Sequence, residues 1–432
     1  YKTCKHLEGN LYLAPNEIRA CCQRFFHKGK MRGDAVLLKT SKGQKISSED
    51  ILKAREKMFQ NIQNDKEEAC LGCNYIVENE KPKITKESNF LSIEHHSFCN
   101  LKCTYCSEIY YGGKKPDYDV VDFLNVYGKE GNLKKCSQVV WGGGEPTLDK
   151  NFKKMLLDIN KIASPKIYHR VFTNSVIFKD SIKEFLDEEL IKVVTSLDAG
   201  TPETFKKIRG KDKFIDVFKN LNKYSEKNPG RVTVKYILTE GNSSDHELEQ
   251  FVENCIKYNL DQCCYQISMN YKFENLSFDN FKAAIYLFSK LTSNKVKKVF
   301  IDDHILARFS QLGENEIEKL KKFLKMKKIE NVIFDSEKIN SIVIFGAGQL
   351  SKELINKAKF FKNAKFDIVD SSKAKIGKIF NGKVIKDPVI LKNDKRPIYI
   401  SAAQSYDSIF SYLNTLNKTD DKIIEFAISE NI

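Results

Sequence analysis

Short apolar runs alternate with amphipathic helical stretches between Phe90 and Met269, and this alternation constrains the fold more than any other feature. Runs rich in β-branched and aromatic residues recur six times, at 90–94, 138–141, 167–173, 192–197, 231–238 and 264–269. The stretch after Lys150 spaces its apolar side chains as one face of a helix would. Strands separated by helices are typical of β-α units that form a parallel sheet. We therefore expect an α/β fold with six such units.

The N-terminal region, residues 1–85, consists of short segments between cysteines. One helix is expected at 48–62, and a hairpin is expected to turn at Pro15 and Asn16. Because it lacks a longer apolar pattern, this region is expected to be hardly able to build a core unaided. We treat it as a cysteine-rich module that precedes the β-α units at 86–275.

Two further regions follow the β-α units. Residues 276–338 are expected to be a helical extension and linker, with lysine-rich helices at 281–291 and 314–326. Residues 339–432 open with an apolar strand, a glycine turn, a helix and a second strand. This order predicts a small α/β domain.

Composition and charge narrow the functional classes. With 41% hydrophobic residues, the 432-residue chain has a globular composition. Its net charge of +15 should attract anions, but the lysines are interleaved with acids along the whole chain, which is typical of solvated helical faces. Nucleic acid is therefore not the expected partner. No apolar run long enough for a membrane span and no leader-like segment stand out, so we expect a cytoplasmic protein.

The chain contains twelve cysteines, and their placement is uneven. In a reducing compartment such a number favours metal ligation or redox chemistry over disulfides. Five lie near the N-terminus, at Cys4, Cys21, Cys22, Cys70 and Cys73. Three more lie at Cys99, Cys103 and Cys106, and the scattered remainder are Cys136, Cys255, Cys263 and Cys264. The scattered four are interpreted as ordinary buried cysteines.

The central motif is Cys99-Asn-Leu-Lys-Cys103-Thr-Tyr-Cys106, directly after the first expected strand. Three thiolates within eight residues can hold one side of a metal cluster, and soft sulfur ligands select iron-sulfur or zinc. A cubane cluster has four irons, so three cysteines leave one iron open for chemistry. On the triad alone, a zinc site completed by His95 or His96 remains an alternative.

The C-x-x-x-C-x-aromatic-C spacing, after the first strand of a six-unit β-α chain, resembles the radical S-adenosylmethionine (radical SAM) superfamily. Further motifs of that family follow in order. A G-G-E segment ends the second strand, a T-N-S segment stands where the family commonly has T-N-G, and S-L-D and K-I-R-G segments come later. The residues matched are Gly143, Gly144, Glu145, Asn174, Ser196, Asp198 and Arg209.

This resemblance implies a partial (β/α)6 TIM-like barrel with its site at the strand ends. It implies a 4Fe-4S cluster on the cysteine triad, with S-adenosylmethionine (AdoMet) chelating the open iron. The reduced cluster would break the carbon-sulfur bond of AdoMet, and the resulting 5′-deoxyadenosyl radical would abstract a substrate hydrogen. A reductase, a flavodoxin or a ferredoxin is the implied electron donor.

The resemblance also assigns roles to single residues. The two glycines would let the backbone approach the ligand, and Glu145 would accept from the methionine amino group. Polar groups of the S-L-D and K-I-R-G segments would hold the ribose and carboxylate. Tyr105 would either lie by the adenine or simply pack the loop.

Four separated N-terminal thiolates, at Cys4, Cys21, Cys70 and Cys73, are what a closed cluster or a structural zinc requires. Their order and the hairpin resemble the SPASM or twitch auxiliary-cluster modules of radical SAM enzymes. This implies a second, auxiliary 4Fe-4S cluster with Cys21, not Cys22, as ligand. In most relatives the module follows the barrel, whereas here it precedes it. Structural zinc stays an alternative, and so does an auxiliary cluster with an open iron.

In the C-terminal region Gly346-Ala347-Gly348, followed by Asp370 after the next strand, approximates the dinucleotide fingerprint G-x-G-x-x-G plus acid. Ser351 replaces the third glycine. The region resembles small nucleotide-binding modules attached to bacterial sugar-modifying enzymes, which implies a Rossmann-like domain that binds a nucleotide. A purely structural or oligomerising domain is the alternative.

Together these features favour radical oxidation or rearrangement of a nucleotide-linked sugar or a surface-polysaccharide precursor. The substrate would be a small or nucleotide-linked molecule. Peptide modification, the commonest occupation of SPASM relatives, is the first alternative. A basic RNA-binding or RNA-modifying protein and a non-catalytic electron carrier are the others.

Overall fold

The computed structural model describes residues 1–73, 75–106, 113–163, 167–294, 296, 298–302, 305, 312–329, 341–348, 351–352, 355–356, 365–402, 406–418 and 423–424. Two compact units are present: Tyr1–Val234 with Tyr258–Cys263, and Lys235–Lys257 with Cys264–Ile432. The domain boundaries expected from the sequence stay predictions.

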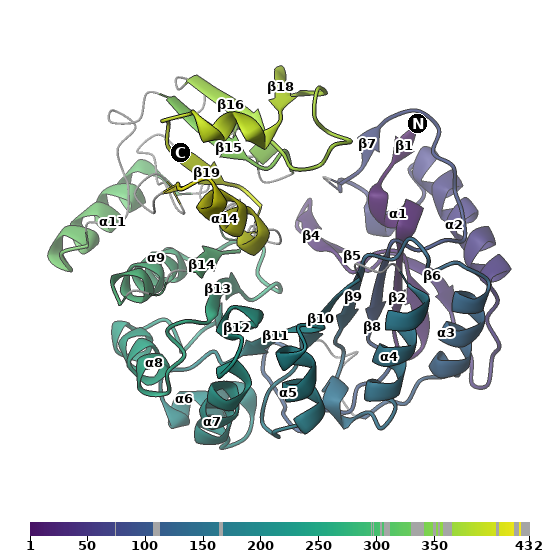
Figure 1. Ribbon diagram of the computed structural model, residues 1–432, viewed down its shortest axis with the longest axis horizontal. Coiled ribbons are helices and arrows are strands. Elements are labelled where there is room, and N and C mark those ends of the chain that lie inside the picture. The colour runs from purple at the N-terminus through teal and green to yellow at the C-terminus, as the bar shows by residue number, and fades with distance from the viewer. Residues whose placement is uncertain are drawn as a thin grey trace. The chain divides into compact units, whose positions relative to one another are not determined.

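Four parallel strands form the centre of the first unit (Figure 1). They are β8 (Phe90–Ile93), β9 (Gln138–Trp141), β10 (Tyr168–Phe172) and β11 (Ile191–Ser196). In register, Phe90 stands beside Gln138, which stands beside Tyr168. These four strands confirm the ones expected from the alternating pattern, each within about a residue of its expected ends. Their short runs of β-branched and aromatic residues are typical of strands.

Helices follow these strands and cover the sheet (Figure 1). They are α3 (Val120–Lys129), α4 (Phe152–Ile162), α5 (Asp180–Asp187), α6 (Pro202–Arg209) and α7 (Phe214–Ser225). The apolar face expected after Lys150 is the buried face of α4, with Phe152, Met155, Leu156 and Ile159. At the start of α6, Thr201 accepts a hydrogen bond from the backbone of Thr204, as an N-cap should.

The N-terminal segment adds strands to the same sheet. They are β2 (Asn10–Leu13), β3 (Glu17–Arg19) and β6 (Val36–Lys39), and the order is β11-β10-β9-β8-β2-β3-β6. β2 runs parallel to β8, with Asn10 beside Phe90, and antiparallel to β3. The expected hairpin is confirmed, because the Ala14 N–H donates to the Glu17 carbonyl at 3.0 Å across the turn. The remaining N-terminal strands are β1 (Lys2–Thr3), β4 (Arg24–His27), β5 (Lys30–Gly33) and β7 (Val77–Glu78).

The N-terminal segment also has a small cluster of buried side chains, although its strands depend on β8 for their sheet partner. Helix α1 (Lys5–Gly9) and helix α2 (Ser48–Gln63) contribute buried side chains to it, including Leu7, Met58, Phe59 and Ile62. Fully buried Arg55 of α2 donates to the carbonyls of Thr85, Glu87 and Asn10 at 2.7–2.9 Å. These bonds satisfy a buried charge and attach α2 to the strands, which short sequence windows do not reveal.

The second unit begins within β12 (Val232–Leu238) and continues through β13 (Cys264–Met269) and β14 (Lys298–Ile301). Helices α8 (Asp245–Lys257), α9 (Phe278–Ser293) and α11 (Glu314–Met326) accompany them. β14 pairs in parallel with β13, so the region expected to be helix and linker contains a strand. That expectation was incomplete because the apolar run Val299-Phe300-Ile301 is short and directly follows a segment with three lysines, at 295, 297 and 298.

A six-stranded sheet follows in the second unit, ordered β17-β18-β16-β15-β19-β20. Its strands are β15 (Ser341–Phe345), β16 (Lys365–Val369), β17 (Ile379–Phe380), β18 (Lys383–Lys386), β19 (Ile398–Ile400) and β20 (Ile423–Ile424). All neighbours are parallel except β17 with β18. Helix α14 (Tyr406–Thr415) precedes β20. Much of the helix expected after the glycine turn lies outside the described residues.

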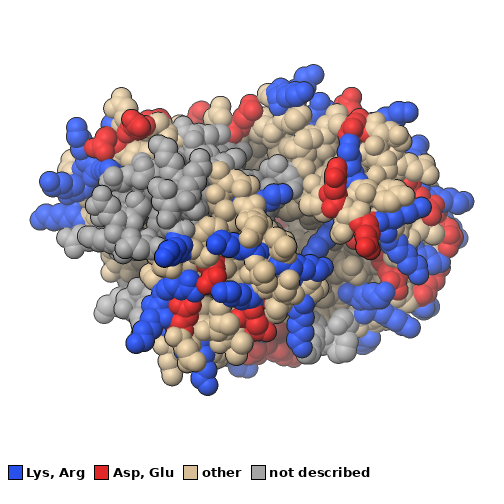
Figure 2. All heavy atoms as spheres, turned by 90° about the horizontal axis from the view of Figure 1, so that it is seen from above, with Lys and Arg blue, Asp and Glu red and all other residues tan. Residues whose placement is uncertain are grey.

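Charged side chains of both signs cover the visible face. Figure 2 shows Lys and Arg spread over it, with Asp and Glu between them. On the helices, ion pairs one turn apart also join charges of opposite sign, such as Lys154 with Asp158 and Lys183 with Asp187, both at 2.7 Å. In the part of the chain that the structure describes, every helix is too short or too polar to cross a membrane.

Candidate active site

The cysteine triad lies in the loop that leaves β8. Cys99 is exposed, Cys106 is half-buried and Cys103 is buried. A tetrahedral zinc would bring its ligand atoms to within about 4 Å of one another. Among the described residues, the one close group of three or more potential ligands contains His95, His96 and Asp149 and no cysteine. Neither histidine is grouped with a cysteine there, and the cluster on the triad stays a prediction.

The end of helix α6 holds this loop by its backbone. The Lys102 N–H donates to the Arg209 carbonyl at 3.0 Å, and the Thr104 N–H donates to the Ile208 carbonyl at 2.9 Å. Gly210 caps α6 with a φ of 81°, and a Cβ there would lie 2.7 Å from the Lys102 carbonyl oxygen. Only glycine permits both this backbone conformation and this approach.

The G-G-E segment after β9 supports the loop from the other side. The Gly144 N–H donates to the His96 carbonyl at 2.9 Å, and the Glu145 N–H donates to the Phe98 carbonyl at 2.6 Å. A Cβ on Gly144 would lie 2.2 Å from the Phe98 oxygen, and Gly143 has a φ of 86°. The glycines were expected to admit a ligand, and the groups that approach them here are the backbone of the triad loop.

Glu145 joins two strand ends. Its carboxylate accepts from the hydroxyls of Thr147 and Thr173 at 2.7 and 2.8 Å and from the Asn174 N–H at 2.7 Å. The side chain is almost fully buried, and burial raises its pKa despite these bonds. Both oxygens thus already bind protein donors. The expected contact with the methionine amino group stays a prediction.

Asn174 reaches the triad directly. Its amide nitrogen donates to Asn100 Oδ1 at 2.6 Å and lies 3.6 Å from the Cys99 sulfur. Its Oδ1 accepts from the Val176 N–H at 3.0 Å, which fixes the orientation of the amide. Asn100 was not singled out from the sequence. Its position between two cysteines of the motif was the only available signal.

Tyr105, Asp198 and Arg209 form one buried network. Asp198 Oδ2 accepts from the Tyr105 hydroxyl at 2.5 Å and from Arg209 Nη1 at 3.0 Å, and Arg209 also donates to the Tyr105 hydroxyl. Asp198 is fully buried and has a φ of 62°, a conformation that aspartate tolerates better than most residues. Ser196, also expected at the site, is the half-buried last residue of β11.

Arg209 also sets the electrostatics of the triad. Burial raises the pKa of both Cys99 and Cys103, and the positive charge of Arg209 opposes that rise. A thiolate is the form that binds a metal, so Arg209 favours the binding form. The sequence named Tyr105, Asp198 and Arg209 separately, and the structure brings them together.

The N-terminal cysteines gather at a second place in the first unit. Cys4, Cys21, Cys70 and Cys73 line one pocket, whose wall is otherwise mainly apolar and includes Leu7, Ala20, Ala35, Met58 and Ile62. Cys22 does not line this pocket, and its electrostatic neighbours include Glu94 and Tyr12. Burial raises the pKa of Cys21 and of Cys70 to about 12, so without a cation these thiols stay protonated.

A tight turn brings Cys70 and Cys73 together. The Cys73 N–H donates to the Cys70 carbonyl at 3.1 Å. Gly72 has a φ of 73°, and a Cβ there would lie 2.0 Å from His27 Nδ1. The turn thus presents two cysteines to the pocket while the His27 ring packs against its glycine.

The glycine turn of the second unit lies at the carboxyl ends of β15 and β16, as expected. Gly346 has a φ of 116°, and a Cβ on Gly348 would meet nothing within 4 Å. Asp370 Oδ2 accepts from the Ala347 N–H at 2.8 Å and from Lys375 Nζ at 2.7 Å. Burial tends to raise the pKa of Asp370, but Lys375 and backbone N–H groups bring it below its usual value. The expected acid is present, with Lys375 beside it.

Comparisons with known proteins bear on residues 93–255, which match the family model described as the radical SAM superfamily. A GTP 3′,8-cyclase of Clostridium botulinum (strain Okra / Type B1) is 25% identical over 178 residues, covering 41% of this chain and 55% of the relative. A GTP 3′,8-cyclase of Haemophilus influenzae (strain 86-028NP) is 28% identical over 160 residues, covering 36% and 46%. The chain spans about half the length of these curated relatives.

Solved structures also resemble the chain. Streptococcus suis SuiB bound to its precursor peptide SuiA is 17% identical, with 62% of this chain and 68% of that chain covered and a TM-score of 0.40. The structure of anSMEcpe with bound AdoMet is 20% identical, with 52% and 66% covered and a TM-score of 0.39. The family match includes every strand-end motif from Cys99 to Arg209, so residues 93–255 are similar to the radical SAM superfamily.

Proposed function

We propose that Cys99, Cys103 and Cys106 hold a 4Fe-4S cluster that cleaves AdoMet. The observation that carries the proposal is the convergence of the exposed end of this triad, Asn174 and buried Arg209 in one family-matched region. When bound, the cluster and AdoMet supply a 5′-deoxyadenosyl radical that abstracts a substrate hydrogen.

The protein's own residues prepare this site. The backbones of α6 and of the G-G-E segment fix the triad loop from two sides, so the thiols are held in place before any cofactor arrives. Arg209 favours the thiolate forms. The polar groups proposed to bind AdoMet are Tyr105, Gly143, Gly144, Glu145, Asn174, Ser196, Asp198 and Arg209.

We propose that Cys4, Cys21, Cys70 and Cys73 hold an auxiliary 4Fe-4S cluster. Support comes from the four thiols that line one pocket and from Cys22, which does not line it. Four cysteines occupy all four irons of a cubane, which suits electron transfer to or from a substrate.

The C-terminal domain is proposed to be Rossmann-like and to bind a nucleotide through Gly346, Gly348 and Asp370. The strand order β18-β16-β15-β19-β20, numbered along the chain, is 3-2-1-4-5, the order of dinucleotide-binding sheets. The glycine turn lies at the carboxyl ends of the central strands, where such sheets bind phosphate. Lys375, beside Asp370, adds a positive charge suited to a phosphate.

The substrate is proposed to be a nucleotide-linked sugar or a surface-polysaccharide precursor that the enzyme oxidises or rearranges. Two features support a nucleotide-linked molecule: the glycine turn of the second unit, and the GTP 3′,8-cyclase activity for which the curated relatives are named. A flavodoxin, a ferredoxin or a reductase would deliver the electron.

Anaerobic reconstitution tests the proposal. The loaded protein, given dithionite and AdoMet, should release 5′-deoxyadenosine, and a nucleotide sugar should stimulate the release. A Cys99→Ala chain is the matched control and should release none. If intact AdoMet persists under strong reduction, the proposed function is wrong. Stimulation by a peptide, and not by nucleotide sugars, would replace the proposed substrate class with the peptide alternative.

A further inference from the structure

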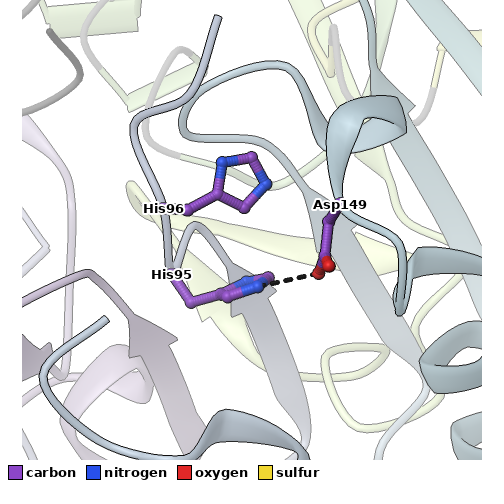
Figure 3. A group of neighbouring side chains, drawn as sticks. All are labelled: His95, His96 and Asp149. Carbon is purple, nitrogen blue, oxygen red and sulfur yellow. Dashed lines mark hydrogen bonds and ion pairs between the residues drawn. The ribbon is translucent and has the colours of Figure 1, made fainter. Parts of the chain in front are cut away.

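Two histidines at the start of the triad loop and an aspartate from another segment converge (Figure 3). His95 and His96 follow β8, and Asp149 follows the 3-10 helix η3 (Pro146–Leu148). His95 Nε2 lies 2.9 Å from Asp149 Oδ2, and the two imidazole rings stand at 90° with centroids 4.9 Å apart. One potential ligand atom from each residue lies within 4.8 Å of the other two.

This cluster is enclosed by protein. His95 is 9% exposed and His96 is 4% exposed, while Asp149 is half-buried. Asp149 Oδ1 accepts from the Asn151 N–H at 2.9 Å, which leaves Oδ2 directed at His95. The three side chains are therefore fixed in a small space and not spread over a solvated surface.

The hydrogen bond between His95 and Asp149 does not by itself explain the arrangement. The other ring nitrogen of His95, Nδ1, is buried and has no hydrogen-bond partner. A hydrogen bond to a charged group stabilises the fold, and a buried polar atom without a partner destabilises it by a comparable amount. The two terms nearly cancel, so the pair alone gains little from being buried.

A metal ion would change this balance. Two imidazoles and a carboxylate are a ligand set that Zn²⁺ binds, with bonds of about 2.0–2.2 Å and a fourth position left for water. In that geometry neighbouring ligand atoms stand about 3.3 Å apart, so His95 and Asp149 need to separate by only a few tenths of an ångström. Binding of a structural zinc ion contributes directly to the free energy of folding, and this gain exceeds the cost of the unpaired nitrogen.

Metal binding has one identifiable cost at His96. The Phe98 N–H lies 3.2 Å from His96 Nδ1, so this nitrogen now acts as an acceptor. Ligation through Nε2 places the ring proton on Nδ1 and ends that contact. A single neutral hydrogen bond contributes little, so this loss is small beside the free energy of metal binding.

We propose that His95, His96 and Asp149 bind a divalent metal ion, with Zn²⁺ favoured over Mg²⁺ and Ca²⁺ because two of the three ligands are imidazoles. The ion is distinct from both proposed iron-sulfur clusters, since no cysteine belongs to the set. It would join the segment that leads into Cys99 to the segment that follows Glu145. The proposal does not depend on AdoMet cleavage.

Zinc itself is the probe that tests this site. The full chain, in a background with Cys99, Cys103 and Cys106 changed to Ala, is dialysed against buffered Zn²⁺, and zinc per chain is measured by mass spectrometry. His96→Gln and Asp149→Asn should each remove about one zinc per chain relative to that background. The matched control is His246→Gln, a change at an exposed histidine of α8, which should leave the zinc content unchanged.

X-ray absorption keeps the test independent of how well the variants fold. Zinc in the unsubstituted histidine background should show nitrogen or oxygen neighbours at about 2.0–2.1 Å. A shell of sulfur alone at about 2.3 Å, or equal zinc contents in the background and in both folded variants, overturns the proposal. If the wild-type chain leaves AdoMet intact while the triad-free background holds this zinc, the proposed function is wrong and this inference stands.

Discussion

The two cysteine sets of this chain occupy opposite kinds of environment. The triad extends from exposed Cys99 to buried Cys103, and its neighbours are polar or charged: Asn174, Glu145 and Arg209. The N-terminal four line a mainly apolar pocket. Burial is the largest influence on the thiol pKa values of both sets, but at Cys99 and Cys103 the charge of Arg209 opposes it.

This difference separates two uses of the same ligand. A cluster that must meet a polar cofactor needs an accessible iron and nearby charge. A cluster that only exchanges electrons is better enclosed, since full ligation and low solvent access protect it. The number of cysteines does not distinguish a cofactor-binding cluster from an electron-transfer cluster. The surroundings of the two sets support the roles proposed for them.

The largest expected effect comes from removing one thiol from either set. Cys103→Ala should lose about four irons per chain and all AdoMet cleavage, because three thiolates are the minimum for the open cluster. Cys73→Ala should lose the other four irons and keep reductive AdoMet cleavage in the absence of substrate. Iron and sulfide analysis with 5′-deoxyadenosine assays checks both. Loss of both clusters from either variant would break the comparison.

The neighbouring residues Cys21 and Cys22 allow a sharper test of which thiols form the N-terminal set. Cys21 lines the N-terminal pocket and Cys22 does not. Cys21→Ala should therefore remove about four irons, whereas Cys22→Ala should leave the iron content unchanged. The electron paramagnetic resonance spectrum of the reduced protein supplies a second measurement. Equal losses from the two variants would contradict the assignment of Cys21.

A glycine pair tests how the triad loop is held. Gly210→Ala must accommodate a Cβ 2.7 Å from the Lys102 oxygen at a φ of 81°. Gly43→Ala has a similar φ of 78° and nothing within 4 Å, so it isolates the cost of the backbone conformation. We expect about 1–2 kcal/mol lost from the free energy of unfolding for Gly43→Ala and roughly 1–3 kcal/mol more for Gly210→Ala. Urea unfolding measures both.

The iron content of the same glycine variants separates the two cysteine sets. Gly210→Ala should lower the occupancy of the triad cluster and leave the N-terminal cluster intact, because only the triad loop contacts α6 through Lys102 and Thr104. Identical behaviour of the two variants would show that this contact does not position the triad.

The smallest expected effect is the loss of stability in acid that buried His169 of the parallel sheet causes. His169 of β10 is fully buried beside Trp141, whose Nε1 donates to His169 Nδ1 at 3.2 Å. Burial lowers the pKa of His169 from 6.5 to about 4. Above pH 6.5 the ring is neutral in both states and contributes nothing. Between pH 6.5 and 4 only the unfolded chain takes the proton, so stability falls by up to about 3 kcal/mol.

His169→Gln should flatten this acid limb, and the exposed His246→Gln should not. Urea unfolding from pH 7 to 4.5 measures the difference. A wild-type acid limb in the His169→Gln chain would assign the effect to other groups. Iron analysis of the same samples would show whether the proposed triad cluster is released at higher pH than the proposed N-terminal cluster.

Local patterns predicted much of the fold. Strands such as β9 and β13 are short, mainly apolar runs, and their bounds were predicted to the residue. β14 was missed because its apolar run is short and follows lysines. The pairing of β2 with β8 was missed because it joins residues far apart in the sequence, and no local window contains both.

The candidate site shows the same division. Motif spacing named Tyr105, Asp198 and Arg209, but not that they form one hydrogen-bonded network. It named Glu145 as a ligand contact, whereas the structure uses its carboxylate to join Thr147, Thr173 and Asn174. The convergence of His95 and His96 on Asp149 depends on the packing of two loops, which residue spacing does not encode.

The parallel pairing of β2 with β8 has a consequence for biosynthesis. A ribosome releases Asn10 long before it releases Phe90, so the N-terminal strand has no sheet partner while most of the cysteine module emerges. Closing so long a segment is entropically costly until the first central strand exists. Assembly of the proposed N-terminal cluster should therefore come late in synthesis. A chain shortened past β2 would leave an edge of β8 open to aggregation.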